Sequence, residues 1–133
     1  EEFLQSLASL LAPGGRLLTY CRAAAVRNSL RHAGLELRSL LPKAGEKSEW
    51  SSGTLALCSK DRDQTPPETG PGWCGLSVME EEHLQTRAGV PYRDPSGTDV
   101  AASILKRRQQ EQALSYRPST SAWQRKWGLL RQA

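Results

Sequence analysis

The chain has 133 residues, a formal net charge of +4 and 24% charged residues. No apolar run approaches the roughly 20 residues that cross a bilayer as a helix, so we expect no membrane span and a cytoplasmic protein. The apolar residues are concentrated between Phe3 and Cys58, whereas Pro, Gly, Ser, Gln and charged residues prevail after Lys60. Only about the first 60 residues can therefore build a packed core, which is small for independent stability. The basic charge suits a polyanionic partner such as RNA, although many soluble domains carry a similar charge.

Residues 1–59 alternate between helical and extended patterns. Apolar residues at three- and four-residue spacing predict a helix over 1–12, with Phe3, Leu4, Leu7, Leu10 and Leu11 on one stripe. Consecutive Leu17 and Leu18 predict a strand that is covered on both faces. The expected elements are a helix over 1–12, a Pro-Gly-Gly break at 13–15, a strand over 16–21, a helix over 23–33 closed by Gly34, a strand over 35–41, a loop over 42–52 and a strand over 53–59.

This order of elements indicates an α/β fold. A strand, a crossover helix and a second strand form the βαβ unit of a doubly wound sheet. The last two strands are expected to form an antiparallel pair at the edge of that sheet. The strand over 16–21 then lacks a neighbour on its other side, and we expect that neighbour to lie outside this chain.

The rest of the chain predicts a linker followed by helices. Residues 60–76 are rich in Pro, Gly and charge, as a linker is. Ser77 and Glu80 have the spacing of a capping box, which predicts a short helix up to about residue 87. A longer helix is expected over 98–116 with Thr98 as its cap, and a last short one carries Trp123 and Trp127 on one face. We therefore divide the chain into a part of an α/β domain (1–59), a linker (60–76) and a helical, partly irregular C-terminal extension (77–133).

No spacing typical of a metal site occurs in the sequence. The three cysteines are odd in number and form no CxxC pair, so we expect reduced thiols at Cys21, Cys58 and Cys74. His32 and His83 stand alone, and the acidic run at 80–82 fits the first turn of a helix better than a metal site. No metal is expected.

Several motifs, taken in order, resemble the family that methylates the modified wobble uridine of tRNA, the MnmC-type methyltransferases. EEFL followed by LAPGG is similar to a helix of that family, and the matched positions after it are Thr19, Tyr20, Ala24, Val26, Arg27, Leu30, Ala33 and Gly34. The tail VPYRDPSGTDVAASILKRRQQEQ…TSAWQRKWG is similar to the extension of cyanobacterial-type members.

The resemblance implies the C-terminal half of a class I, Rossmann-like methyltransferase with S-adenosylmethionine as cofactor. The glycine-rich cofactor loop and the acidic loop of the family are not in this chain, and we expect them before Glu1, together with the catalytic residues. The missing N-terminal half would then bind most of the cofactor, and this chain alone is expected to be inactive. The loop over 42–52 also departs from the family, because it lacks a G-x-G-x-K-R-E run.

Residues at the end of the first strand are the candidate binding site. Ligands of open α/β sheets bind outside the carboxyl ends of the strands, which is where the sequence places Thr19, Tyr20 and Arg22. Thr19 and Tyr20 could donate hydrogen bonds to a cofactor carboxylate or a substrate base, and Tyr20 could stack on a nucleobase. The other interpretation is that Tyr20 packs at the strand end and Arg22 is a solvated surface residue.

Basic residues supply the candidate RNA contacts. Arg27 lies at a matched position, and cations flanked by flat rings suit RNA. The candidates are Arg27, Lys106, Arg107, Arg108, Arg125 and Lys126. An ordinary surface arginine explains Arg27 equally well. For the other five residues, a solvated helix face, with the two tryptophans attaching the tail to a core, is the stronger interpretation.

Two functions from different classes therefore remain. The first is the C-terminal part of a tRNA methyltransferase. The second is a non-catalytic module for RNA or protein binding formed by 77–133, with a Rossmann-like remnant before it. Another methyltransferase or a nucleotide-binding Rossmann protein as the source of residues 1–59 also stays open.

Overall fold

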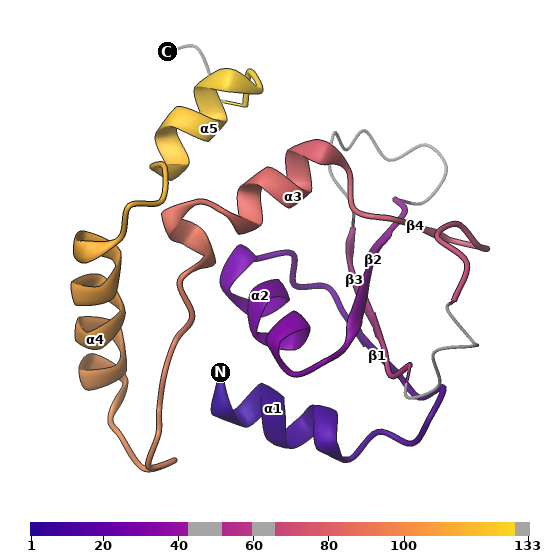
Figure 1. Ribbon diagram of the computed structural model, residues 1–133, viewed down its shortest axis with the longest axis horizontal. Coiled ribbons are helices and arrows are strands. Elements are labelled where there is room, and N and C mark those ends of the chain that lie inside the picture. Colours follow the sequence, from indigo (N-terminus) through magenta and orange to yellow (C-terminus); the bar gives the residue numbers. More distant parts are fainter. Residues whose placement is uncertain (43–51, 60–65, 130–133) are drawn as a thin grey trace.

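The chain forms a four-stranded sheet with helices packed along one of its faces (Figure 1). The structure, a computed structural model, describes residues 1–42, 52–59 and 66–129. The loop predicted over 42–52 and the linker predicted over 60–76 lie partly outside the described residues. The elements are α1 (Glu2–Ser9), β1 (Arg16–Thr19), α2 (Ala24–His32), β2 (Glu36–Leu40), β3 (Gly53–Leu57), β4 (Trp73–Cys74), α3 (Val78–Leu84), the 3₁₀ helix η1 (Arg87–Gly89), α4 (Ala101–Leu114) and α5 (Thr120–Lys126).

The strand order is β1-β3-β2-β4, and β3 runs antiparallel to both of its neighbours. β1 and β2 are therefore parallel to each other, as a strand–helix–strand unit requires, with Ala56 opposite both Leu17 and Leu37. The predicted antiparallel pairing of β2 with β3 is confirmed, but its expected position at the sheet edge is wrong. β3 is a central strand because its sequence, GTLAL, carries no charge and all five of its residues are buried.

A glycine allows β3 to lie close to the end of β1. A Cβ atom at Gly53 would lie 2.3 Å from the Thr19 carbonyl oxygen, which is closer than any side chain could approach. The predicted end of α2 is also confirmed, because Gly34 has a φ of +88° and follows the Ala33 cap. Both glycines therefore fix how the helix–strand connections meet at the two ends of the sheet.

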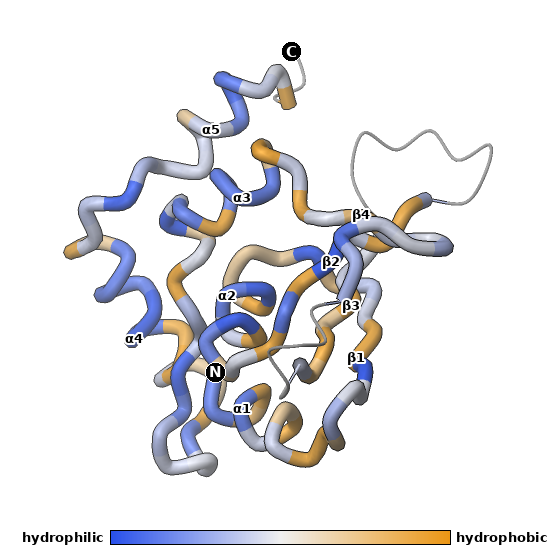
Figure 2. Tube along the Cα trace, turned by 45° about the vertical axis from the view of Figure 1, so that its right-hand side comes forward, coloured by the Kyte–Doolittle hydropathy of each residue, from blue (hydrophilic) through white to orange (hydrophobic). Residues whose placement is uncertain are grey.

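The core combines residues from the first part of the chain with one from the extension. Leu30 of α2, Leu37 of β2, Ala56 of β3 and Leu84 of α3 belong to one buried cluster. Leu30, Ala56 and Leu84 are 0% exposed. Figure 2 shows hydrophobic segments in α1, β1 and β3, whereas α4 is mostly hydrophilic. Residues 77–90 thus pack onto the core of the first part rather than onto a core of their own.

The predicted stripe of α1 is divided between two surfaces. Leu4, Ala8 and Leu11 pack against the core, but Phe3 and Leu10 are 74% and 82% exposed. The five apolar residues of the stripe cover a wider arc than one packing face, so those at its margin stay outside.

The predicted cover on both faces of β1 is not found among the described residues. Leu17 packs against the core, while Leu18 is 64% exposed. β1 is the outer strand of the described sheet and pairs with β3 alone there, so one of its edges and part of one face lack a neighbour.

The extension follows the predicted pattern with three corrections. α3 starts with the predicted capping box, in which Ser77 and Glu80 exchange side-chain and backbone hydrogen bonds. β4 lies in the predicted linker and pairs with β2. The long helix begins at Ala101, so Thr98 is not its cap, and the predicted helix up to residue 87 ends at Leu84.

Candidate functional site

Thr19, Tyr20 and Arg22 lie together in the short connection between β1 and α2, which we call the rim loop (19–23). The Thr19 hydroxyl oxygen accepts a hydrogen bond from the Cys21 backbone N–H at 3.1 Å, which closes a local turn. Tyr20 is 92% exposed and Arg22 is also exposed. The loop follows the carboxyl end of β1, where ligands of α/β sheets bind. The structure therefore presents these residues at the expected edge, and their role in binding stays a prediction.

Arg27 is buried directly beneath the rim loop. Its side chain is 0% exposed, so in this fold its guanidinium group does not reach a surface where RNA phosphate could bind. Nε donates to the Thr54 hydroxyl at 2.8 Å, and Nη2 donates to the Gly53 carbonyl oxygen at 3.0 Å. The Thr54 hydroxyl in turn donates to the Cys21 carbonyl oxygen at 2.8 Å. The surface position expected for Arg27 is thus corrected, because the helix places this residue on the side of α2 that faces the sheet.

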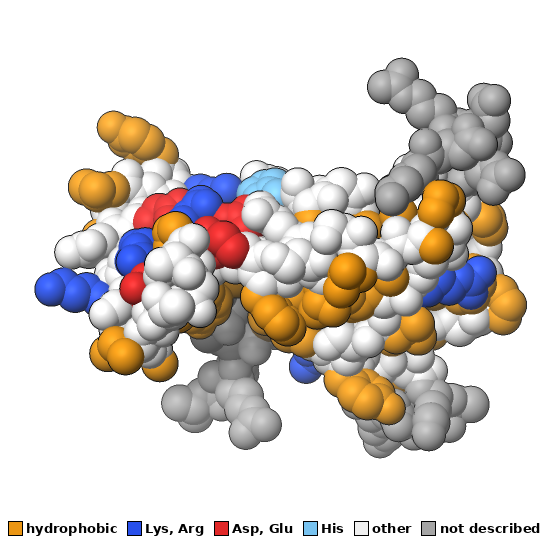
Figure 3. All heavy atoms as spheres, turned by 90° about the horizontal axis from the view of Figure 1, so that it is seen from below, with side chains coloured by type: hydrophobic (Ala, Val, Ile, Leu, Met, Phe, Trp, Pro, Cys, Tyr) orange, Lys and Arg blue, Asp and Glu red, His pale blue; other side chains and the backbone are white. Residues whose placement is uncertain are grey.

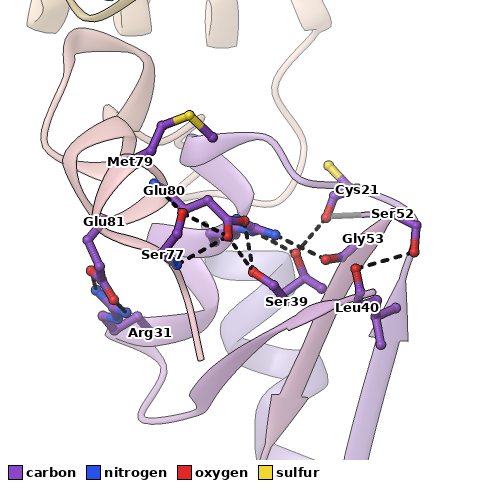
Figure 4. A network of polar contacts seen from close by, with 12 residues as sticks. Cys21, Arg31, Ser39, Leu40, Ser52, Gly53, Ser77, Met79, Glu80 and Glu81 are labelled. Carbon is purple, nitrogen blue, oxygen red and sulfur yellow. Dashed lines mark hydrogen bonds and ion pairs between the residues drawn. The ribbon is translucent and has the colours of Figure 1, made fainter. Parts of the chain in front are cut away.

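Glu80 of α3 is the acidic partner of Arg27 (Figure 4). Arg27 Nη1 lies 2.6 Å from Glu80 Oε2, and Glu80 is 5% exposed. The Ser39 hydroxyl lies 2.9 and 2.8 Å from the two carboxylate oxygens, and the Ser77 backbone N–H donates to Oε1 at 3.2 Å. A buried ion pair needs this many hydrogen bonds, because each charge has lost its water.

The surroundings of Glu80 keep its carboxylate ionised. Burial alone would raise its pKa, but the hydrogen bonds from Arg27 and Ser39, together with the charge of Arg27, lower the pKa below its ordinary value of 4.5. The pKa of His83, one turn along α3, is lowered below 6.5 by burial and by the nearby charge of Arg27. The His83 ring stacks on Trp123 with centroids 4.2 Å apart, so a neutral imidazole joins α3 to α5.

Two of the candidate RNA-binding arginines make contacts within the extension. Arg108 donates to the carbonyl oxygens of Val90 and Ala88 at 2.8 and 3.0 Å, and its guanidinium group lies 4.3 Å from the ring centroid of Tyr92. Arg107 donates to an Asp99 carboxylate oxygen at 2.8 Å. Both side chains are half-buried, so they attach α4 to the segment before it, and phosphate binding by them stays a prediction.

The remaining candidates lie on the surface. Lys106 and Arg125 are exposed, and Lys126 lies 2.6 Å from a Glu82 carboxylate oxygen. The predicted pinning tryptophan is Trp123, which is 4% exposed and donates from Nε1 to the Met79 carbonyl oxygen at 2.9 Å. Trp127, by contrast, is 37% exposed and donates to Glu82.

Sequence reasoning missed three members of the buried network, which are Ser39, Thr54 and Glu80. A signal for the burial of Arg27 was present, because it lies three residues after Ala24 and three before Leu30, on the apolar side of the helix. Its partner could not be inferred, because 53 residues separate Arg27 from Glu80.

The described residues contain no group of three or more His, Cys, Asp or Glu side chains that could hold a metal ion. The cysteines in this part of the chain are free, with Cys58 buried and Cys21 and Cys74 partly exposed. None of the helices in the described ranges is both long and apolar enough to cross a membrane.

Comparison with known proteins finds a similarity to a protein family over the first part of the chain. Residues 1–56 match the family described as S-adenosyl-L-methionine-dependent methyltransferase. No curated protein and no solved structure matches the chain. The matched segment contains α1, β1, α2, β2 and most of β3, and therefore also the rim loop and Arg27. The segment that carries the candidate site is thus similar to S-adenosylmethionine-dependent methyltransferases.

Proposed function

We propose that the chain is the C-terminal part of a methyltransferase that transfers a methyl group from S-adenosylmethionine to the aminomethyl group of the modified wobble uridine in tRNA. The observation that carries the proposal is the match of residues 1–56 to the methyltransferase family, over the segment that forms the rim loop. The order of motifs described above, from EEFL to the extension, supports the tRNA substrate.

The residues of the rim loop fit a contact at one side of such a cofactor. Thr19 and Tyr20 have hydroxyl groups and Arg22 has a cation, which are suitable partners for a carboxylate or a phosphate. No glycine-rich loop for a nucleotide occurs in the sequence. The chain therefore supplies part of a cofactor or substrate site, and an N-terminal half would supply the rest.

The open side of β1 supports a larger domain. Leu18 on β1 is 64% exposed, and the edge of β1 opposite β3 has no strand beside it among the described residues. Figure 3 shows hydrophobic side chains on the face that contains α1, where Phe3 and Leu10 are exposed. An additional parallel strand and its helix would cover these apolar groups, each of which favours burial.

The proposed reaction needs a free amine held in line with the methyl group. When bound, S-adenosylmethionine would supply an activated methyl group on a sulfonium sulfur. The amine would gain that methyl group and lose a proton, and S-adenosylhomocysteine would leave. Positioning and local electrostatics would be the main contributions to the rate of such a transfer. In this chain, Tyr20 would stack on the uridine and Arg22 would bind the neighbouring phosphate.

The extension would add contacts to the tRNA. Lys106, Arg125 and Lys126 are exposed cations on α4 and α5, and Trp127 lies beside Lys126. Phosphate neutralisation by such residues makes binding weaken with salt. We therefore expect the affinity of the full-length protein for tRNA to fall steeply between low and moderate salt.

Methyl transfer by the full-length protein tests the proposal. The substrate is tRNA that carries the unmethylated aminomethyl uridine, the control is the same tRNA already methylated, and nucleoside mass spectrometry measures the product. Replacing the exposed Tyr20 by Ala should lower kcat/KM about tenfold, as the loss of one stacked base does. Tyr116→Ala is the matched control, because Tyr116 is also fully exposed but lies beyond α4. No methyl transfer to the unmethylated tRNA, or equal effects of the two variants, would contradict the proposal.

The chain alone should not bind the cofactor, because it lacks the nucleotide loop. Titration calorimetry of the 133-residue chain with S-adenosylmethionine should show no binding at millimolar concentration. Binding at that level would place the cofactor site within this chain.

A binding module made of 77–133 alone is the second function considered above. The helices of this segment contact one another through hydrogen bonds, but the buried Leu84 and Glu80 pack against α2 and the sheet. An isolated peptide of this segment is therefore expected to be unfolded, and a folded peptide with salt-dependent tRNA binding would favour the module.

A further inference from the structure

The buried network connects the extension to the rim loop through a chain of direct contacts. Glu80 on α3 pairs with Arg27 on α2, Arg27 donates to Thr54 on β3, and Thr54 donates to the carbonyl oxygen of Cys21 in the rim loop. The three distances are 2.6, 2.8 and 2.8 Å. In Figure 4, Glu80 on α3 and Cys21 at the end of β1 are labelled, and dashed lines mark the interactions drawn in the region between them.

The side chains of this hydrogen-bonded series are buried. Arg27 and Thr54 are 0% exposed and Glu80 is 5% exposed. Ser39 holds the Glu80 carboxylate from the β2 side, and the capping box holds it from α3. Removing the carboxylate would leave a buried cation without its partner, so Arg27 would have to move or gain water.

The rim loop is also held at its two ends, because Thr19 lies opposite Thr54 in the β1–β3 ladder and the Arg27 backbone N–H donates to the Ala23 carbonyl oxygen. Its own turn is closed by one hydrogen bond, from the Cys21 N–H to Thr19, and Gly53 supports the backbone of 19–20 by close approach. Arg27 also donates to the carbonyl oxygen of Gly53. A shift of Arg27 would therefore act on the loop through both Thr54 and Gly53.

We infer that Glu80 is a positioning residue for the site at the rim, so that α3 of the extension sets the conformation of Thr19, Tyr20 and Arg22. This inference rests on the proposed function for its consequence in catalysis. The extension is then part of the substrate site even though Glu80 touches no substrate. Its carboxylate acts through Arg27, which lies within the family match, whereas Glu80 lies outside it.

Alkylation of the cysteines in the full-length protein tests the inference without a measurement of enzyme activity. Cys21 is a partly exposed rim-loop residue, whereas Cys58 is buried in the core and reports on global unfolding. Glu80→Gln should raise the rate at which iodoacetamide alkylates Cys21 about tenfold and leave the rate at Cys58 unchanged. A tenfold change corresponds to about 1.4 kcal/mol, which is the order of one hydrogen bond. Glu81→Gln is the matched control, because Glu81 is the next residue of α3 and pairs outward with Arg31.

If Glu80→Gln unfolds the protein, the alkylation rates at Cys21 and Cys58 will rise together, and a second variant then decides the result. Thr54→Val keeps the Arg27–Glu80 ion pair and removes the Thr54 hydroxyl, which accepts from Arg27 and donates to Cys21. A faster rate at Cys21 alone in this variant supports the inference. An unchanged rate at Cys21 in a folded Glu80→Gln protein, or in Thr54→Val, overturns it.

Steady-state kinetics separates positioning from loss of folded enzyme. A displaced rim loop should raise KM for tRNA about tenfold with a small change in kcat, because Tyr20 and Arg22 bind the substrate. A smaller folded fraction would lower the apparent kcat and leave KM unchanged, and that result in both Glu80→Gln and Thr54→Val would overturn the inference. If the wild-type protein transfers no methyl group, the proposed function fails, but the cysteine rates still decide the structural inference.

Discussion

Truncation of Leu84 tests whether the extension and the first part of the chain form one folding unit. Leu84 belongs to α3, is 0% exposed and packs in the cluster that contains Leu30 and Ala56. Replacing a fully buried leucine by alanine costs about 2.7–5 kcal/mol, because apolar contacts are lost and a cavity remains. For a urea dependence of about 1–3 kcal/mol per molar, this loss lowers the midpoint of unfolding by roughly 1–5 M.

Urea denaturation followed by two signals measures the effect. Tryptophan fluorescence includes Trp123 in the extension, and far-ultraviolet circular dichroism reports on all helices. We expect both signals to shift together in Leu84→Ala, and Leu114→Ala to shift neither, because Leu114 is 83% exposed. A shift in fluorescence without one in circular dichroism would refute the shared core, and so would a midpoint change below about 0.3 M.

Three further predictions concern the contacts of the extension. Gly89→Ala should lower the free energy of unfolding by at least about 1–3 kcal/mol, because its Cβ would lie 2.1 Å from a carbonyl oxygen of α3; Gly75→Ala, with 3.7 Å to its nearest neighbour, is the control. The lowered pKa of Glu80 adds stability above pH 4.5, and this contribution is lost as the pH falls through the pKa of Glu80 in the folded protein. Over this pH range, the urea midpoint should therefore fall less steeply in Glu80→Gln than in the wild-type protein. The lowered pKa of His83 likewise makes stability fall as the pH drops below 6.5. Imidazole titration by NMR should show a pKa below that of a free histidine, and an ordinary pKa would mean that the His83 ring is not buried beside Arg27 in solution.

The elements of the fold were largely readable from the sequence, because they depend on neighbouring residues. Breaks at glycine, the capping box of Ser77 and Glu80, and the periodicity of α2 are local signals, and the structure bears out each of them. The position of β3 between β1 and β2 could not be predicted, because it depends on which strands pair with one another after the chain has folded. The short β4 was hidden in a segment of linker composition, because two residues carry no periodic pattern.

In the candidate site, too, local features could be predicted from the sequence and long-range contacts could not. The sequence placed Thr19, Tyr20 and Arg22 at the end of a strand, which follows from topology alone. It gave Arg27 a surface position, because an arginine is rarely buried without a partner and the partner is 53 residues away. A carboxylate that already satisfies a helix cap gives no sign in the sequence that it also neutralises a distant cation.

The position of β3 between two strands that precede it has a consequence for synthesis on the ribosome. β1 and β2 are translated first, yet neither can form a ladder with the other, because the strand that joins them comes later in the chain. Until Leu57 has emerged, β1 and β2 therefore both lack β3 as a neighbour, and the buried positions of Arg27 and Leu30 stay open until α3 follows. Such intervals favour aggregation, so we expect this part of the chain to depend on rapid completion or on chaperones while it is made.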